Sequence, residues 1–353
     1  MTHPFRVIDT GIREGRANIS FDQAMIDAHQ QNLIPDSIRF LQFPPTALIG
    51  RHQDLSRELN LDHCHDNGIG IVRRITGGGA IYLDEGQLGW VLVFHRSTLG
   101  IASLTDLSRE ICVAAAAGLS RLGINACYRP RNDIEVDGRK ISGTGGLFDG
   151  DTMLFQGTVL VDMNPQHMVA ALNVPQAKLA KRALDSSVQR VVTLRELLGE
   201  QAPSLDEIKA ALLAGFAENL GIEPVSGEVT LAEEEFAKQL FDEEIGTDEF
   251  VTEINHPEED MLLCGTHSGA GGTVTSYVKL EGVNHDRVHS VLITGDFFVT
   301  PPRVILDLEA ALKGVDTDNI EATIEKFFQD TCIDTLTVSP ADFYASIESA
   351  LQA

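Results

Sequence analysis

The alternation of apolar and polar residues along the chain predicts short β-strands interleaved with helices. A period of two, which is typical of half-buried strands, occurs at residues 69–73, 79–83 and 89–94, on both sides of a run of glycines. Apolar residues at helical spacing predict helices at residues 17–31 and 104–122. Because helices and strands are mixed and many strands follow one another like hairpins, we predict an α+β fold of largely antiparallel sheets packed with helices.

The last third of the chain has a different composition and hydrophobic pattern, which indicates a second domain. Residues 221–260 are very acidic and show little periodicity. A glycine run, an alternating hairpin and two helical patterns follow them. We therefore predict a large domain of residues 1–245 and a small α+β domain of residues 246–353, which is a usual division for a chain of 353 residues.

The composition narrows the classes of function. Lys and Arg number 27 against 52 Asp and Glu, which gives a formal net charge of −25. A nucleic-acid-binding protein would carry a basic surface, so we predict no nucleic-acid partner. No apolar run approaches the roughly 20 residues of a membrane span, and the first residues are polar. We therefore expect a cytoplasmic protein without a membrane segment, in which basic clusters mark candidate sites for an anion.

The stretch that begins at Arg73 carries the first candidate site. Arg73 and Arg74 are followed by three consecutive glycines, at residues 77–79. Glycines cost backbone entropy, so a run of them indicates a conformation closed to other residues or a ligand that touches the main chain. Their N–H groups can cradle an anion, and the arginines can bind phosphate or carboxylate. A hairpin turn with solvated arginines is the alternative, and the spacing alone leaves both open.

A second glycine-rich stretch carries Lys140, which is followed by glycines within residues 143–146. A lysine among glycines beside a sheet can reach a phosphate or polarise a carbonyl. Asn132 and Asp133, just before it, could hold a magnesium ion through oxygen ligands. The alternatives are a solvated lysine at a strand end and a simple Asx turn.

These stretches and several others occur in an order that resembles the lipoate–protein ligase A family, part of the biotin and lipoate ligase superfamily. The matching stretches are Asn18-x-x-x-Asp22, residues 47–53 (ALIGRHQ), residues 73–80 (RRITGGGA), residues 132–143 (NDIEVDGRKISG), residues 156–158 (QGT) and residues 178–181 (KLAK). Towards the C-terminus, residues 271–274 (GGTV), 278–280 (VKL) and 295–298 (GDFF) resemble the accessory domain of these ligases.

The resemblance implies a two-step ligation on a catalytic domain. Lipoate and ATP, with Mg²⁺, would give lipoyl-adenylate and pyrophosphate. A lysine on a lipoyl domain or carrier protein would then attack the adenylate, and AMP would leave. Val72, Tyr82 and Val136 are our predictions for the walls of an apolar tunnel that holds the acyl chain.

The resemblance also implies a role for each matching residue. Lys140 is the predicted catalytic residue, which would bond the acyl carbonyl and phosphate oxygens as charge develops. Asp133 would lie near the magnesium ion, and Lys178 in a loop that closes over the adenylate. The predicted substrate and adenylate contacts are Arg73, Thr76, Gly77, Gly78, Gly79, Ala80, Asn132, Asp133, Gln156, Gly157, Thr158 and Lys178.

Two departures from the family's usual residues, and one cysteine, leave other functions open. Many family members have His where this chain has Leu83 and Gln156, and glutamine cannot titrate. A lipoate-binding protein without catalysis is therefore one alternative. The sister octanoyltransferases use a cysteine nucleophile and no ATP, and Cys127 lies 13 residues before Lys140, near their cysteine position. A Cys127-dependent transferase is the main alternative, and the acceptor protein and the preference among lipoate, octanoate and biotin are left open.

Overall fold

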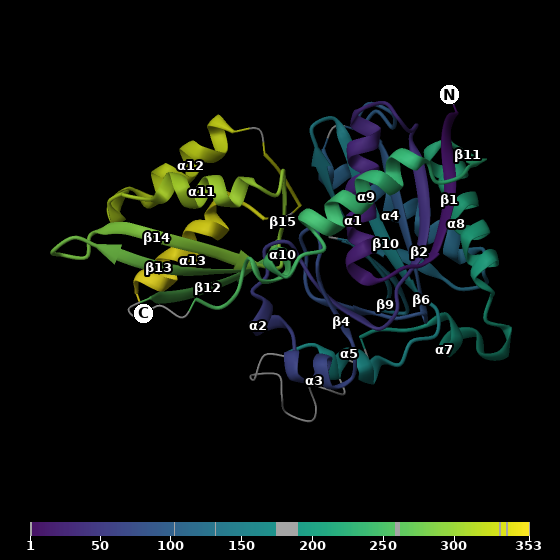
Figure 1. The fold of residues 1–353 in the computed structure, drawn as a ribbon, viewed down its shortest axis with the longest axis horizontal. Coiled ribbons are helices and arrows are strands. Elements are labelled where there is room, and N and C mark those ends of the chain that lie inside the picture. The colour runs from purple at the N-terminus through teal and green to yellow at the C-terminus, as the bar shows by residue number, and fades with distance from the viewer. Residues whose placement is uncertain are drawn as a thin grey trace.

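The computed structural model describes residues 2–101, 103–130, 132–173, 190–257, 262–331, 333–336 and 338–352. Lys178, the predicted loop lysine, lies outside these ranges. The described residues form two units side by side, a larger N-terminal unit built on a wide sheet and a smaller C-terminal unit (Figure 1). None of the described helices is long and apolar enough to cross a membrane.

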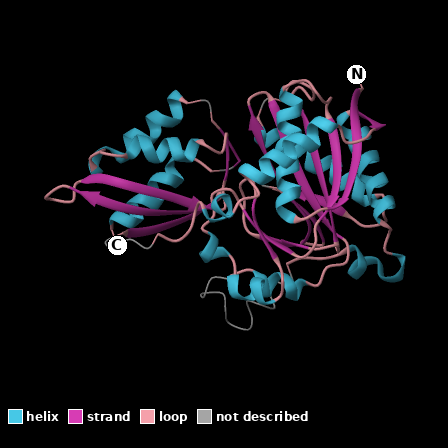
Figure 2. Ribbon diagram, in the orientation of Figure 1, coloured by secondary structure: helices cyan, strands magenta, loops and turns pink. Residues whose placement is uncertain are grey.

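An eight-stranded sheet forms the centre of the N-terminal unit, in the order β11-β1-β2-β6-β10-β9-β8-β7. The strands are β1 (His3–Ile12), β2 (Ser37–Gln42), β6 (Gln87–His95), β7 (Ala126–Arg129), β8 (Asp133–Val136), β9 (Arg139–Asp149), β10 (Thr152–Leu160) and β11 (Ile222–Ser226). β1 pairs in parallel with β2 and β11, and the other neighbours pair antiparallel. The central strand β6 is buried along nearly its whole length, because helices cover both faces of the sheet (Figure 2).

Two pairs of helices cover the sheet. α4 (Leu104–Ser120) and α8 (Leu205–Leu220) pack on the face that carries Trp90 and Phe155. Their contact is close, since a Cβ at Gly215 would lie 2.3 Å from the carbonyl oxygen of Ala114. α1 (Gly15–Gln30) and α9 (Leu231–Glu243) pack on the opposite face. The sheet is therefore a rigid middle layer on which a site can be held.

A small sheet lies beside the large one and carries the glycine loop. It has the order β4-β3-β5, with β3 (Thr46–Ile49), β4 (Gly70–Arg73) and β5 (Ile81–Leu83). Short helices lie near it, namely α2 (Leu55–Glu58), α3 (Leu61–Asp66), α5 (Pro165–Ala171) and α10 (Asp248–Thr252). A further short helix, α7 (Leu194–Leu198), begins just after the chain passes β9 a second time. The glycines at residues 77–79 connect β4 to β5.

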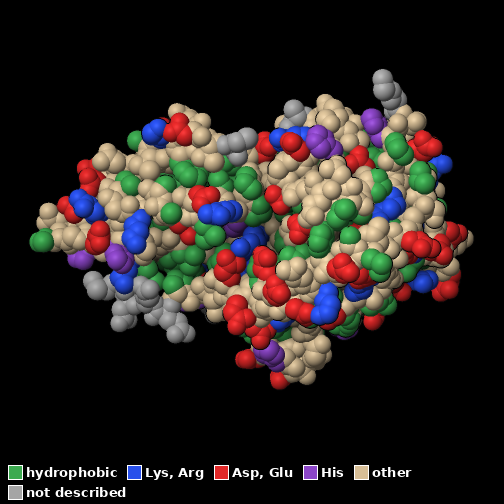
Figure 3. Space-filling view, turned by 45° about the horizontal axis from the view of Figure 1, so that its top comes forward, with side chains coloured by type: hydrophobic (Ala, Val, Ile, Leu, Met, Phe, Trp, Pro, Cys, Tyr) green, Lys and Arg blue, Asp and Glu red, His purple; other side chains and the backbone are tan. Residues whose placement is uncertain are grey.

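The C-terminal unit has its own apolar core. Its three-stranded sheet consists of β12 (Leu263–Gly269), β13 (Gly272–Glu281) and β14 (Arg287–Gly295), and its helices are α11 (Val304–Leu312), α12 (Ile320–Asp330) and α13 (Pro340–Leu351). A two-stranded ribbon of β15 (Phe298–Thr300) and β16 (Asp334–Leu336) lies between this unit and the large sheet (Figure 1). Acidic side chains occur over both units on the face seen in Figure 3.

The predicted α+β class is confirmed by the mixed sheets and the helices that cover them. Four strands of the described residues were missed, namely β11, β12, β15 and β16. Residues 222–226 form the edge strand β11, although their acidic setting gave no clear period of two. The predicted boundary at residues 245/246 stays a prediction; α10, just beyond it, packs through Val251 on the small sheet of the N-terminal unit.

The ribbon strand β15 joins the two units through polar and aromatic contacts. The Thr300 hydroxyl donates to the carbonyl oxygen of Phe148 at 2.6 Å and accepts from the Phe148 N–H at 2.8 Å. The buried ring of His52 stacks on Phe297, with ring centroids 5.1 Å apart. The His52 carbonyl oxygen also accepts from the N–H of Gly295 at 2.9 Å. The C-terminal unit is therefore held by specific contacts at the end of the glycine loop.

His52 makes this contact sensitive to acid. Burial, together with the charges of Arg51 and Arg73, lowers the pKa of His52 from 6.5 to about 3. The unfolded chain therefore binds a proton at His52 below pH 6.5, while the folded chain does not. We predict that the free energy of unfolding falls as the pH drops from 6.5 towards 3, by at most about 1.4 kcal/mol per pH unit from this group.

Denaturant titrations at several pH values test this prediction. His52→Gln should remove this part of the pH dependence, whereas His65→Gln, a change at an exposed histidine of α3, should leave it in place. Equal slopes of stability against pH in His52→Gln and the unaltered protein would contradict the assignment.

Candidate functional site

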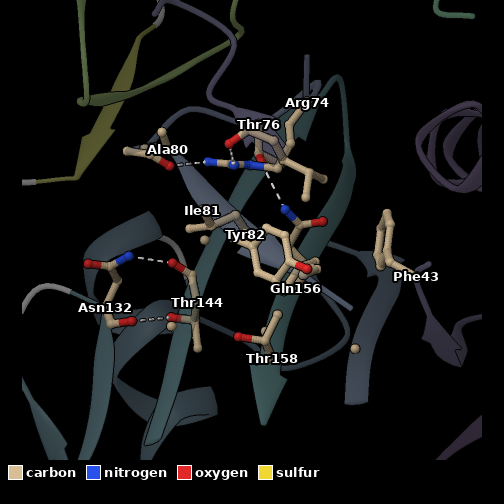
Figure 4. A pocket seen from close by; sticks show the side chains of 18 of the residues that line it. Phe43, Arg74, Thr76, Ala80, Ile81, Tyr82, Asn132, Thr144, Gln156 and Thr158 are labelled. Carbon is tan, nitrogen blue, oxygen red and sulfur yellow. Dashed lines mark hydrogen bonds between the residues drawn. The ribbon is translucent and has the colours of Figure 1, made fainter. Parts of the chain in front are cut away.

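A cavity of about 270 Å³ lies between the large sheet, the small sheet and α1. Figure 4 shows Gln156 and Thr158 on one strand, with Tyr82 near them and Arg74 above. Most of the predicted contacts come together here. Those that line the cavity are Thr76, Gly77, Gly78, Gly79, Ala80, Asn132, Lys140, Gln156, Gly157 and Thr158.

The glycine loop needs its glycines for close backbone contacts. Gly78 has a φ of 93°, a backbone conformation that residues other than glycine rarely adopt. A Cβ at Gly50 would lie 1.9 Å from the Gly78 carbonyl oxygen, and a Cβ at Gly77 would lie 2.3 Å from that of Phe297. The N–H of Gly78 donates to the same Phe297 carbonyl at 3.1 Å. The loop is thus pressed between β3 and the C-terminal unit.

Arg74 provides a buried positive charge in the wall of the cavity. Its side chain is buried, and its guanidinium donates to the carbonyl oxygens of Gly79 at 2.9 Å and Gly77 at 3.2 Å. Burial lowers the pKa of Arg74 to about 10, so it stays charged at neutral pH. Within the described part of the chain, no carboxylate forms an ion pair with it. A buried cation without a counter-ion favours binding of an anion.

Arg73 does not take the place predicted for it. Its guanidinium is buried and donates to several backbone carbonyls, among them those of Gln53 at 2.7 Å and Ile254 at 2.7 Å. It is not among the residues that line the cavity. Because successive side chains near a strand point to opposite sides, Arg73 and Arg74 cannot both face the ligand. Arg73 instead ties the small sheet to the chain around α10.

Gln156 and Thr76 form the polar floor beneath Arg74. The Gln156 side-chain amide donates to the Thr76 hydroxyl at 2.9 Å (Figure 4). On the other side, the Thr144 hydroxyl donates to the Asn132 carbonyl at 2.9 Å, and the Asn132 amide donates to the Thr144 carbonyl. These bonds fix the turn before β8 against β9, so that Asn132 is held at the edge of the cavity.

Lys140 lies at the mouth of the cavity, paired with a carboxylate. Its ammonium is 2.7 Å from Asp133 Oδ1, and the lysine side chain is about one-third exposed. It lies over Gly143, where a Cβ would be 2.7 Å from Lys140 Nζ. Arg129 also pairs with Asp133. Burial raises the pKa of Asp133, but Lys140 and Arg129 outweigh it and hold the pKa below its usual value.

Asp133 itself does not line the cavity. It is paired with two cations, which disfavours it as a magnesium ligand in this arrangement. The part of the chain that the structure describes also holds no group of three or more Asp, Glu, His or Cys suited to a metal. The magnesium role of Asp133 therefore gains no support from the geometry.

Cys127 lies apart from the cavity. It is exposed on β7, the edge strand, and is not a lining residue. In the pairing of the strands, Cys127 is opposite Glu135, and Glu135 is opposite Lys140. Two strand spacings of about 4.8 Å thus separate Cys127 from Lys140, which is about 10 Å.

Most of the remaining cavity wall is apolar. Of the predicted tunnel walls, Tyr82 lines it, while Val72 and Val136 are buried in the cores on either side and do not. The apolar lining includes Leu41, Phe43, Leu48, Ile81, Leu83 and Met163. Leu83, which replaces a histidine common in the family, therefore extends the apolar wall.

The C-terminal unit contributes one wall through Phe298. Its ring lies against the glycine loop and β9, because a Cβ at Gly78 would be 2.6 Å from the ring and one at Gly145 would be 2.5 Å from it. Phe298 lines the cavity together with residues more than a hundred positions earlier in the chain. No local sequence pattern predicts this contact, apart from the glycines that make room for it.

Comparison with known proteins decides the family. The model of the lipoyl protein ligase A/B catalytic domain matches residues 14–217, which is more than half of the chain. The chain belongs to the lipoyl protein ligase A/B family. The predicted family is thus confirmed, and the chain is an enzyme of a family that contains both ligases and transferases.

Relatives of both kinds match this member of the family. Octanoyltransferase LipM of Halalkalibacterium halodurans is 29% identical over 271 residues, which cover 70% of this chain and 98% of the relative. Lipoate-protein ligase A subunit 1 of Thermoplasma acidophilum is 29% identical over 245 residues, which cover 67% of this chain and 91% of the relative. Sequence identity therefore does not separate the two reactions.

Three solved structures share the fold. A bipartite lipoate protein ligase from T. acidophilum, studied with its E2 lipoyl domain, has a TM-score of 0.64 at 27% identity and covers 72% of this chain and 99% of its own. Lipoate-protein ligase A bound with ATP has a TM-score of 0.62 at 27% identity, covering 71% and 99%. Plasmodium falciparum LipL1 in complex with lipoate has a TM-score of 0.74 at 17% identity and covers 99% of this chain and 100% of its own, which shows a fold shared over nearly the whole chain.

The contact of Phe298 with Gly145 gives a testable prediction. Gly145→Ala would push a methyl group into the Phe298 ring and should destabilise the protein by about 1–3 kcal/mol. Gly70→Ala is a matched control, since its Cβ would meet nothing closer than 3.4 Å. In a Phe298→Ala background the cost of Gly145→Ala should largely vanish in denaturant titrations. An unchanged cost in that background would contradict the contact.

Proposed function

We propose that this protein is an ATP-dependent ligase that activates lipoate as lipoyl-adenylate and transfers the lipoyl group to a lysine of an acceptor protein. The observation that carries the proposal is the buried guanidinium of Arg74, which no carboxylate of the described residues neutralises, at one end of a largely apolar cavity. A carboxylic acid with a long apolar chain complements both features, since its carboxylate matches the cation and its chain fills the apolar part.

ATP as the co-substrate is supported by the glycine loop and by a relative. Backbone N–H groups in a glycine loop beside an arginine are suited to phosphate oxygens. Lipoate-protein ligase A, which is 27% identical to this chain, has been solved with ATP bound. The N–H of Gly78 donates to the Phe297 carbonyl, so its use by a phosphate would require the C-terminal unit to move away from the loop.

In the first step, a carboxylate oxygen of lipoate attacks the α-phosphorus of ATP. The bond from that phosphorus to the pyrophosphate oxygen breaks, and pyrophosphate leaves. Arg74 would hold the carboxylate in line and offset the negative charge that gathers between the two reactants. The apolar walls, including Leu41 and Phe43, would bind the chain and exclude water from the mixed anhydride.

In the second step, the free amine of an acceptor lysine attacks the acyl carbon. The bond between that carbon and the AMP oxygen breaks, AMP leaves with the electron pair, and the amine releases a proton to solvent. Lys140 would turn from Asp133 and donate to the carbonyl oxygen, where negative charge develops. Its partial exposure at the mouth of the cavity suits a group that must meet an incoming protein.

A Cys127-dependent octanoyltransferase is the second candidate function. A relative named octanoyltransferase LipM favours it, since this chain matches 98% of that relative's length. The position of Cys127 opposes it, because the thiol lies outside the cavity on an edge strand. The described residues also include a C-terminal unit with its own apolar core, whose sequence resembles the accessory domain of the ligases.

The acceptor that we propose is a lipoyl domain or a related carrier protein with a target lysine. The T. acidophilum relative was studied with its E2 lipoyl domain, which supports that choice. We also propose that the protein acts in the cytoplasm, since the proposed reaction consumes ATP.

Pyrophosphate release tests the proposed function. The protein with MgATP should release pyrophosphate when lipoate is added. Lys140→Ala should lower the rate at least tenfold by loss of a charged donor to the reacting oxygens. Arg139→Ala is the matched control, because Arg139 is the neighbouring cation and pairs with Glu196 instead. Cys127→Ser should release pyrophosphate at the normal rate.

The transferase predicts the opposite pattern. Acyl transfer from octanoyl carrier protein that is lost in Cys127→Ser, with no pyrophosphate released for any acid, would overturn the ligase proposal.

The pairing of Asp133 with Lys140 gives a further prediction. Magnesium that accompanies ATP is held mainly by phosphate oxygens, water and one or two carboxylates, and Asp133 is already paired with cations. We predict that Asp133→Asn lowers the rate of pyrophosphate release by misplacing Lys140, while the Mg²⁺ concentration for half-maximal rate stays the same. A large rise in that Mg²⁺ concentration would instead identify Asp133 as a magnesium ligand.

A further inference from the structure

One row of paired residues crosses the large sheet beneath the cavity. Gly145 on β9 is opposite Gln156 on β10, Gln156 is opposite Val91 on β6, and Val91 is opposite Arg39 on β2. Side chains at directly opposed positions share one face of a sheet. Three strand spacings of about 4.8 Å make this row about 14 Å long, from the end near Lys140 to Arg39.

An eight-carbon acid spans most of this row. Its seven C–C bonds of about 1.5 Å, arranged in a zigzag, reach about 9 Å from the carboxyl carbon. With its carboxylate near Arg74 and Gln156, the far end of the chain arrives above β6 and β2. Ile19 and Asp22 of α1 and Leu41 of β2 line the cavity on this side, so they would meet the end of the chain.

Asp22 is the one acidic side chain among the described lining residues. It is 1% exposed, and its Oδ1 accepts from Arg39 Nη1 at 2.6 Å. Arg39 is fully buried and also bonds Asn18 Oδ1 at 2.5 Å and the Thr10 hydroxyl at 2.9 Å. The guanidinium thus has several partners that hold it in place, and it holds Asp22 at the cavity wall.

The carboxylate has fewer partners than it can accept. Within the described part of the chain, Arg39 is the one side-chain donor to Asp22. An ionised carboxylate can accept about four hydrogen bonds. Burial raises the pKa of Asp22 to about 6, although Arg39 opposes the rise, so its charge is poorly solvated. A ligand that brings a donor to this wall would supply what the protein does not.

We propose that Asp22 selects carboxylic acids of about eight carbons that carry a hydrogen-bond donor, a hydroxyl or a thiol, at the end far from the carboxylate. The proposal rests on the proposed function and specifies its substrate class. The dithiol form of lipoate has such donors, whereas octanoate ends in a methyl group. A methyl group placed against Asp22 would cover the carboxylate without bonding it, which costs free energy.

Binding to the full chain without ATP tests this selection. Calorimetry would compare 8-hydroxyoctanoate with nonanoate, which have the same number of chain atoms and differ in a terminal O–H against a CH₃. We expect the hydroxy acid to bind about tenfold more tightly, from one hydrogen bond to a charged group. Dihydrolipoate should likewise bind more tightly than octanoate. Equal affinities, or tighter binding of nonanoate, would overturn the proposal without any variant.

A variant separates Asp22 from the rest of the wall. Asp22→Asn keeps the size of the side chain and a contact with Arg39 but removes the charge, so most of the preference for the hydroxy acid should be lost while nonanoate still binds. Asp36→Asn is the matched control, since Asp36 is hydrogen-bonded to His29, outside the cavity, and should keep the preference. An undiminished preference in a folded Asp22→Asn protein would overturn the proposal.

These measurements also separate the two proposals. Tight binding of donor-bearing acids without any pyrophosphate release would retain the selection by Asp22 and reject the ligase. Pyrophosphate release with equal affinity for both kinds of acid would retain the ligase and reject the selection.

Discussion

A buried positive charge without a counter-ion is the constraint on which the site depends. Arg74 is held in the wall of the cavity by carbonyl oxygens of the glycine loop, which fix its position but leave its charge uncompensated. Burying a cation is costly, so the protein keeps this one where an anionic ligand can neutralise it. The two other cations nearby have other roles. Arg73 donates to backbone carbonyls, and Lys140 is paired with Asp133 at the mouth of the cavity. In the proposed reaction, charge therefore divides the cavity into an end at Arg74 that would bind the acid and an end at Lys140 that would meet the acceptor.

The glycine loop and the C-terminal unit also meet at one wall of the cavity. The glycines that let the loop bend around Arg74 also let β15 of the C-terminal unit press against it, through Phe297 and Phe298. The same backbone N–H of Gly78 can serve a phosphate or the Phe297 carbonyl, but not both at once. In the proposed reaction, nucleotide binding and docking of the C-terminal unit would therefore be coupled at one atom, the amide nitrogen of Gly78.

Much of the fold and part of the site could be predicted from the sequence, for local reasons. Alternation around the glycines identified β4, β5 and β6, and the glycine loop and Lys140 were placed in one site because their motifs occur together. The choice between Arg73 and Arg74 could not be predicted, because it depends on which side of β4 faces the cavity. Phe298 and the Asp22–Arg39 pair depend on contacts between distant segments, and no local pattern encodes those. The edge strand β11 was missed because pairing with β1, rather than its own alternation, makes it a strand.

The most direct test of the account is the chemical form of the activated acyl group. The protein would be incubated with MgATP and radiolabelled lipoate, without an acceptor, and then separated under denaturing conditions. The account predicts that the label leaves the chain as an acyl-adenylate, and that the mass of the chain is unchanged. No acyl-adenylate from lipoate, together with a hydroxylamine-sensitive acyl thioester at Cys127 when labelled octanoyl carrier protein is the donor instead, would contradict it and would identify a transferase.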